Sequence, residues 1–98
     1  MVSLAERYAE WEVTMLFYSA LHYVDAFLAT RGLHPQSHLE RKYLVASLTN
    51  LARYYDILFK RSMNARYHLY QFAPQEVDRI RNGAFLRVKE GILALLPS

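Results

Sequence analysis

Three polar residues near the middle of the chain have the types and the spacing of a functional site. Arg61, Asn64 and His68 stand at positions i, i+3 and i+7. At 100° per residue, an α-helix places these positions on one stripe that spans roughly two turns, about 10 Å. These three residues are therefore the first candidates for a functional site.

The segment around this stripe, residues 53–71, is the most concentrated basic region of the chain. Its charged and aromatic residues are Arg53, Lys60, Arg61 and Arg66 against Asp56, with Tyr54, Tyr55, Tyr67 and Tyr70 interleaved. Arginines and tyrosines together suit contact with phosphates and stacking on bases. Arg66, Lys60 and Tyr67 are therefore candidate contacts for RNA or a nucleotide. The alternative is a solvated helix face whose tyrosines are half-buried in the fold.

The four histidines offer less specific chemistry. His22 and Asp25, at i and i+3, could be a carboxylate that orients an imidazole for acid–base work, or a hydrogen-bonded polar pair inside a bundle or at a subunit interface. The second interpretation is favoured, because buried polar groups are usually paired. His34 is expected to be a solvated loop residue. Ser37 and His38, at the start of a helix, complete the candidate nucleotide-binding residues.

Several chemistries are set aside. With no cysteine in the chain, disulfides, iron–sulfur clusters and cysteine nucleophiles are excluded. A metal site in a helical bundle usually carries Glu-x-x-His on facing helices, a spacing that does not occur, so no metal is expected. Neither a G-x-S-x-G motif nor a phosphate-binding glycine loop is present, and no cofactor is expected.

Four helices are expected to hold these residues, over about 4–31, 38–48, 51–72 and 75–95. The boundary signals are capping-box patterns at Ser3 with Glu6 and at Ser37 with Glu40, a C-cap at Gly32, a turn at Thr49 and Asn50, and a first-turn proline at Pro74. Nothing in the sequence reads as a strand.

Apolar residues at helical spacing predict which sides of the helices are buried. The first helix has a seam of Leu4, Tyr8, Trp11, Met15, Tyr18, His22, Asp25 and Ala29, and a second stripe of Val13, Phe17, Ala20, Val24, Phe27 and Leu28. The third has Leu48, Leu51, Tyr55, Leu58, Ser62, Ala65, Leu69 and Phe72, and the fourth has Val77, Ile80, Ala84, Val88, Ile92 and Leu95. Because the first helix is apolar on two sides, we expect it to be central and the protein to be an oligomer.

Composition bounds the class of protein. Ninety-eight residues with 53% hydrophobic residues predict one folded domain, residues 1–98, and the fold class is all-α: a four-helix up-and-down bundle with a short second helix. The net charge of +3 permits a polyanionic partner without requiring one. The apolar runs are far shorter than the ~20 residues of a membrane span, and no signal peptide is recognised, so a cytoplasmic protein is expected.

Two segments resemble a known family. LFYSALHYVDAFLATRGLHPQSHLERKYLV, residues 16–45, is similar to the first two helices of HEPN domains (higher eukaryotes and prokaryotes nucleotide-binding). SMNARYHLYQF, residues 62–72, resembles the end of that family's third helix. The resemblance covers about four-fifths of the chain and is looser over the fourth helix.

The resemblance implies a helical bundle that forms a homodimer. Many family members are metal-independent ribonucleases, often toxins partnered by a nucleotidyltransferase antitoxin, with four to six residues between an Arg and a His at the end of the third helix. Arg61 and His68 match this spacing at its upper limit. The roles implied are acid–base help from His68 to a ribose 2′-hydroxyl and charge stabilisation by Arg61, with Asn64 beside them, acting on single-stranded RNA.

A second interpretation stays open. If the alignment is anchored on Ala65, Arg66 and Tyr67, the family's Arg position falls on Ser62 and Arg61 is one residue out of phase. The chain would then be a non-catalytic HEPN module that binds a nucleotide or holds a partner nucleotidyltransferase as a homodimeric scaffold.

Overall fold

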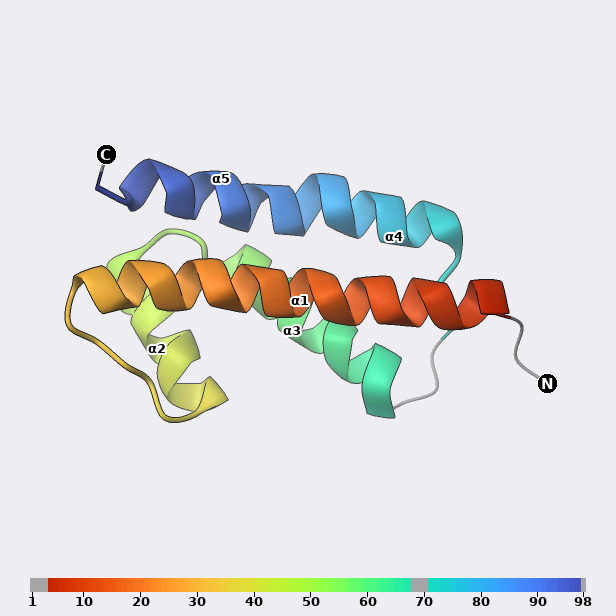
Figure 1. Cartoon of the computed structure of the whole chain (residues 1–98), viewed down its shortest axis with the longest axis horizontal. Coiled ribbons are helices and arrows are strands. Elements are labelled where there is room, and N and C mark those ends of the chain that lie inside the picture. Colours follow the sequence, from red (N-terminus) through yellow and green to blue (C-terminus); the bar gives the residue numbers. More distant parts are fainter. Residues whose placement is uncertain (1–3, 68–70, 98) are drawn as a thin grey trace.

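The chain is an all-helical bundle (Figure 1). The computed structural model describes residues 4–67 and 71–97, with side chains for 8–67 and 71–97. Its elements are α1 (Leu4–Thr30), α2 (His38–Leu48), α3 (Ala52–Tyr67), α4 (Pro74–Ile80), the π-helical turn η1 (Arg81–Phe85) and α5 (Leu86–Leu95). Within the described ranges there is no strand, and no helix combines the length and hydrophobicity needed to cross a membrane.

The direction of the helices differs from the predicted up-and-down order. The ring of Phe17 lies 5.8 Å from that of Tyr55, and Trp11 shares a hollow with Ala65, so α3 runs antiparallel to α1. In Figure 1, α1 and the α4–α5 path run in the same direction, and α3 runs against both. The prediction of an up-and-down bundle was therefore wrong.

The connection between α1 and α2 explains this order. Gly32 adopts φ 73°, the left-handed conformation that favours glycine, and turns the chain at the end of α1. The loop then runs back beside α1, so that the His38 ring reaches within 6.0 Å of the Phe17 ring, well before the end of α1. From there α2 advances toward Asp25, which Arg41 contacts at 2.7 Å, in the same sense as α1. Helix α3 is consequently the antiparallel neighbour of α1.

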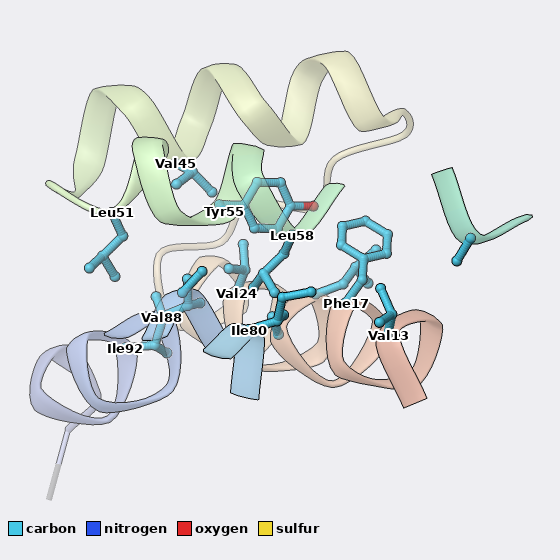
Figure 2. Close-up of a cluster of buried hydrophobic side chains, with 14 of the residues drawn as sticks. Val13, Phe17, Val24, Val45, Leu51, Tyr55, Leu58, Ile80, Val88 and Ile92 are labelled. Carbon is cyan, nitrogen blue, oxygen red and sulfur yellow. The ribbon is translucent and has the colours of Figure 1, made fainter. Parts of the chain in front are cut away.

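The buried face of α1 is the second of its two predicted stripes (Figure 2). Val13, Phe17 and Val24 are fully buried against α3 and the α4–α5 path. The predicted seam is wrong for its large residues, because Tyr8 and Trp11 are each 67% exposed and Met15 is 56% exposed. Both neighbouring helices pack on the same side of α1, and this arrangement leaves the opposite side uncovered.

The seam of α3 was predicted correctly within the helix, but its first predicted member, Leu48, ends α2 instead and is 38% exposed. Leu51, Tyr55, Leu58, Ser62 and Ala65 are all buried, whereas Leu69 lies outside the described residues. Burial raises the pKa of Tyr55 to about 12, so its phenol stays neutral in the core. The turn between α2 and α3 at residues 49–51 is also confirmed.

The end of α3 was predicted too late. Residues 71–73 are not helical, so the buried Phe72 belongs to the connection and not to the helix. The residue before a proline disfavours the α region, which prevents a helix from reaching Ala73. Pro74 begins α4 as predicted, and the Ala73 N–H donates to Glu76 Oε1 at 3.2 Å.

The predicted fourth helix is one path with a π-helical turn in its middle. Its buried residues, Ile80, Ala84, Val88 and Ile92, are separated by three steps of four, which advance by about 120° around a regular α-helix. The π-helical turn takes more residues per turn and offsets most of this drift, so all four residues face the core. Leu95, predicted to be buried, is 43% exposed at the end of α5.

Candidate functional site

A groove lies between α3 and the path of α4, η1 and α5. It encloses about 370 Å³. Its lining residues are Tyr54, Ile57 and Arg61 from α3 and Glu76, Arg79, Ile80, Gly83, Ala84 and Arg87 from the other side. We refer to it as the arginine groove.

Helical spacing brings the polar residues of the arginine groove together. Tyr54 and Arg61 stand seven residues apart and share one face of α3. Arg79, Gly83 and Arg87 follow at steps of four through the π-helical turn, which keeps them on the opposing wall. A Cβ atom added to Gly83 would meet nothing within 4 Å, so the floor of the groove is open at this point.

The groove is positively charged. Three arginines, Arg61, Arg79 and Arg87, stand against one carboxylate, Glu76, which also accepts the Ala73 N–H. None of the three arginines forms an ion pair with another residue that the structure describes. Guanidinium groups that keep their donors available are suited to phosphate oxygens, which they can bind through two parallel hydrogen bonds.

The structure places only part of the predicted polar stripe in the groove. Arg61 lines it and is half-buried, while Asn64 is half-buried one turn further along α3 and is not among the lining residues. His68 lies outside the described residues, so its pairing with Arg61 stays a prediction.

Arg66 and Tyr67, predicted as RNA contacts, face a different neighbour. The Arg66 guanidinium donates to the Tyr18 hydroxyl at 3.0 Å and to the Ser62 carbonyl at 3.3 Å. It lies 5.5 Å from the ring of Tyr18 and 5.1 Å from that of Tyr67. Five residues separate Arg66 from Arg61, about 140° around the helix, so Arg66 is packed against α1 instead of the groove.

Lys60 belongs to a third location. Its ammonium lies 3.0 Å from Asp56, and Lys42 of α2 lies 2.9 Å from the same carboxylate. Hydrogen bonds from Lys42 and Lys60 hold the pKa of Asp56 below its usual range. Lys60 therefore takes part in an ion-pair network that joins α2 to α3.

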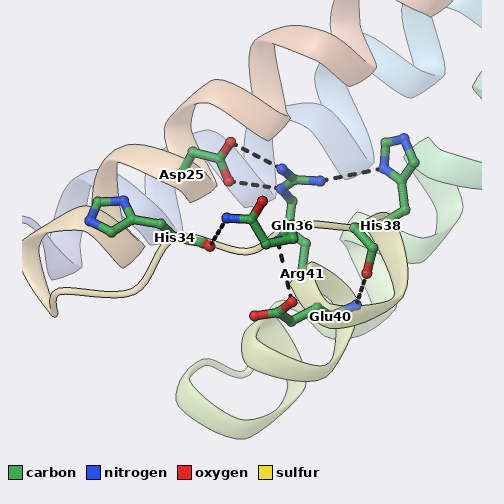
Figure 3. A network of polar contacts seen from close by, with 7 residues as sticks. Asp25, His34, Gln36, His38, Glu40 and Arg41 are labelled. Atoms are coloured by element: carbon green, nitrogen blue, oxygen red, sulfur yellow. Dashed lines mark hydrogen bonds and ion pairs between the residues drawn. The ribbon is translucent and has the colours of Figure 1, made fainter.

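Ser37 and His38 form the start of α2, which Figure 3 shows. The Ser37 hydroxyl caps the helix by accepting the Glu40 N–H at 3.1 Å, as the capping-box pattern predicted, although Glu40 reaches back to Gln36 N–H at 3.2 Å and not to Ser37. The His38 ring lies against Phe17 and Phe59, at 6.0 and 5.4 Å. Burial, followed by the positive charges of Arg41, Arg66 and Lys42, lowers the pKa of His38.

The predicted pairing of His22 with Asp25 was wrong. Figure 3 shows that the carboxylate of Asp25 binds Arg41, at 2.7 Å to Nε and 3.3 Å to a terminal nitrogen, and this bidentate pair ties α1 to α2. His22 is exposed, because it lies on the uncovered side of α1. His34 is exposed in the loop, as predicted.

The predicted site residues are thus divided among three surfaces. Arg61 is in the arginine groove, Lys60 is between α2 and α3, and Arg66 and His38 are on the side toward α1 and α2. Tyr67 is 64% exposed and contacts Arg66. Sequence reasoning missed Arg79 and Arg87. Their separation by two steps of four on a helix could have identified them as a pair on one face.

Comparison with protein-family models, with curated proteins and with solved structures finds no match to the chain.

Proposed function

We propose that the arginine groove binds RNA or a nucleotide through its phosphates and that the chain is a HEPN-type helical bundle. The observation that carries the proposal is the convergence of Arg61, Arg79 and Arg87 from two elements on one groove. Each guanidinium can replace a counterion on a phosphate, and Tyr54 on the same wall offers a ring for base stacking.

The size of the groove agrees with this ligand class. At about 370 Å³ it is near the lower end of the range for small-molecule sites, which suits one nucleotide or a short part of a strand. The π-helical turn lies in the wall of the groove, and such turns occur often at functional sites.

The proposal has a catalytic version, in which the protein is a metal-independent endoribonuclease. In it His68 serves as acid–base partner of a ribose 2′-hydroxyl, Arg61 stabilises the charge on the phosphoryl group, and Asn64 assists them. The position of Arg61 in the groove supports this form. Ser62, the competing arginine position, is fully buried and donates its hydroxyl to the Phe59 carbonyl at 2.8 Å, a location with no room for a catalytic cation.

The alternative is a non-catalytic module that binds a nucleotide or holds a nucleotidyltransferase, as in toxin–antitoxin pairs. The packing of Arg66 against Tyr18 favours it, because that cation is used within the fold and not on a substrate. A homodimer is part of both forms and is supported by the exposed aromatic residues of α1.

The experiment compares RNA binding and cleavage for matched variants in the presence of EDTA. Arg79→Ala and Arg87→Ala should each lower the affinity for a labelled single-stranded RNA by about tenfold at low salt and reduce the salt slope by about 1. Arg53→Ala removes the same charge from an exposed position on α3 outside the groove and should change binding little. Equal losses in all three variants would show that only net charge matters.

The same RNA reports on catalysis. If the protein is a ribonuclease, the wild type cleaves the RNA while Arg61→Ala and His68→Ala do not. Binding without cleavage in the wild type selects the non-catalytic module. An absence of binding in the wild type contradicts both forms.

A further inference from the structure

The arginine groove continues past Tyr54 and Arg87 into a second hollow. These two residues line both the groove and the hollow, so the two spaces share a residue on each wall. The second hollow encloses about 430 Å³ and lies beside the turn between α2 and α3. We call it the Glu90 hollow. Its lining residues are Asn50, Leu51, Tyr54, Arg87, Glu90 and Gly91.

The Glu90 hollow is bounded by segments that are fixed in place. A Cβ atom on Gly91 would lie 2.6 Å from a methyl group of Leu51, so α5 and the turn before α3 are in close contact. Figure 2 shows the Leu51 side chain pointing toward α5. The Thr49 hydroxyl accepts the Leu51 N–H at 3.0 Å and donates to the Val45 carbonyl at 2.6 Å. These bonds hold the turn that carries Asn50, and the hollow is therefore pre-organised for a ligand.

The charges change sign from the groove to the hollow. Arg61 and Arg79 line only the groove, Arg87 stands where the two meet, and Glu90 brings a carboxylate to the hollow. Glu90 forms no ion pair with another residue that the structure describes. The carboxylate of the groove itself, Glu76, lies at the other end, in the first turn of α4. A phosphate is attracted by the arginines and repelled by Glu90, so a nucleotide is oriented with its phosphate in the groove and its base in the hollow.

The spacing of these residues fits one nucleotide. Glu90 follows Arg87 by three residues, a rise of about 4.5 Å along α5. Asn50 precedes Tyr54 by four residues, and because α3 runs against α5, both steps lead from the groove into the hollow. A single sugar ring separates the phosphate of a nucleotide from its base, over a comparable length. Tyr54 stands between the two spaces, where its ring is available for stacking on the base.

We propose that the Glu90 hollow binds the base of a guanine nucleotide whose phosphate lies in the arginine groove. This inference rests on the proposed function and names the base that the site prefers. Guanine carries two adjacent donors on its Watson–Crick edge, the N1–H and the 2-amino group, and one carboxylate can accept both. Adenine, cytosine and uracil have no two adjacent donors on this edge. The amide of Asn50, in the same hollow, can donate to the guanine O6.

Calorimetry of the intact chain with three nucleoside 5′-monophosphates tests the base preference. Guanosine monophosphate should bind about tenfold more tightly than adenosine monophosphate, because adenine loses both hydrogen bonds to a charged acceptor. Inosine monophosphate keeps the N1–H but lacks the 2-amino group, so its affinity should lie between the other two. Equal affinities of all three would contradict recognition of a free guanine nucleotide.

A matched pair of variants tests the role of Glu90. Glu90→Gln keeps the shape of the side chain but loses its charge and one acceptor oxygen, so affinity for guanosine monophosphate should fall about tenfold. Affinity for adenosine monophosphate should not fall, which also shows that the variant is folded. Glu10→Gln makes the same change of charge on α1, outside the groove and the hollow, and should keep the preference for guanine. A preference that persists in Glu90→Gln, or that is lost in both variants, would contradict the assignment.

Guanine can reach this site as a free nucleotide or as a residue of an RNA strand. A short oligouridine with one central guanosine, compared with the same strand of uridine alone, tests the second source. A preference for the guanosine strand or for guanosine monophosphate supports the proposal. If neither is preferred but all ligands bind, the base assignment is overturned while phosphate binding by the arginine groove stands. If no nucleotide and no strand binds, the proposed function fails, and this inference fails with it.

Discussion

At the scale of single residues, the arginine groove brings together three cations that form no ion pair with the residues that the structure describes. Elsewhere acidic partners hold four of the cations: Asp25 holds Arg41, Asp56 holds Lys42 and Lys60, and Glu12 and Asp78 hold Arg81. The more exposed of these pairs contribute little stability, but all of them remove positive charge from the surfaces where they lie. Of the described cations that have no ion pair with a described residue, three, Arg61, Arg79 and Arg87, lie together on one groove.

His38 provides a prediction at the same scale. His38 is exposed overall, but its ring packs against Phe17 and Phe59. This partial desolvation, and then the charges of Arg41, Arg66 and Lys42, lower its pKa, so the folded state favours the neutral imidazole. Below the ordinary histidine pKa of about 6.5, the unfolded chain binds the proton first, and His38 therefore makes stability fall as the pH falls below that value.

An NMR titration of the His38 ring should place its pKa below the ordinary value. Arg66→Met removes one of the positive charges and should raise this pKa, whereas Lys60→Met, whose ammonium is not among the groups acting on His38, should leave it unchanged. A wild-type pKa at or above the ordinary value would show that the imidazole is not held as described.

At the scale of elements, the sequence predicts boundaries better than it predicts partners. The starts of α2 and α4 have local signals in Ser37 and Pro74, and both were confirmed. Which of the two stripes of α1 is buried was harder to predict, because both repeat at helical spacing. Tyr8, Trp11 and Met15 do so as regularly as Val13, Phe17 and Val24. Periodicity finds an apolar side, but only the packing of α3 and α5 decides which side is buried.

The two glycines of the fourth helical path give a prediction at this scale. A Cβ atom on Gly91 would lie 2.6 Å from a methyl group of Leu51, a buried residue just before α3, whereas Gly83 has open space. Gly91→Ala should destabilise the protein by about 1–3 kcal/mol through overpacking, which outweighs the gain in helix propensity. Gly83→Ala should be neutral or stabilising by up to about 1 kcal/mol.

Urea denaturation of both variants beside the wild type measures this difference. The pair is matched, because each variant adds the same methyl group to a glycine of one helical path. A Gly91→Ala variant as stable as Gly83→Ala would mean that α5 does not approach α3 as closely as the structure describes.

At the scale of the whole molecule, the all-helical class follows from helical periodicity, but the order of the helices does not. Whether α2 runs with or against α1 depends on how the loop around Gly32 and His34 returns along α1, and no local pattern encodes that path. The same limit applies to the site. Arg61 was found because it shares a stripe with Asn64 and His68, whereas Arg79 and Arg87 enter the groove only through the approach of a distant segment.

The most direct test of the account is to map the RNA-binding surface by NMR, for which a chain of 11.5 kDa is well suited. Titration with a short single-stranded RNA should shift the backbone amides of residues that line the arginine groove, above all Tyr54, Arg61, Arg79, Gly83 and Arg87. Amides around His38 and Arg41, on the side of α2, should be unaffected. Shifts confined to His38, Arg41 and Arg66, with the groove unchanged, would contradict the account.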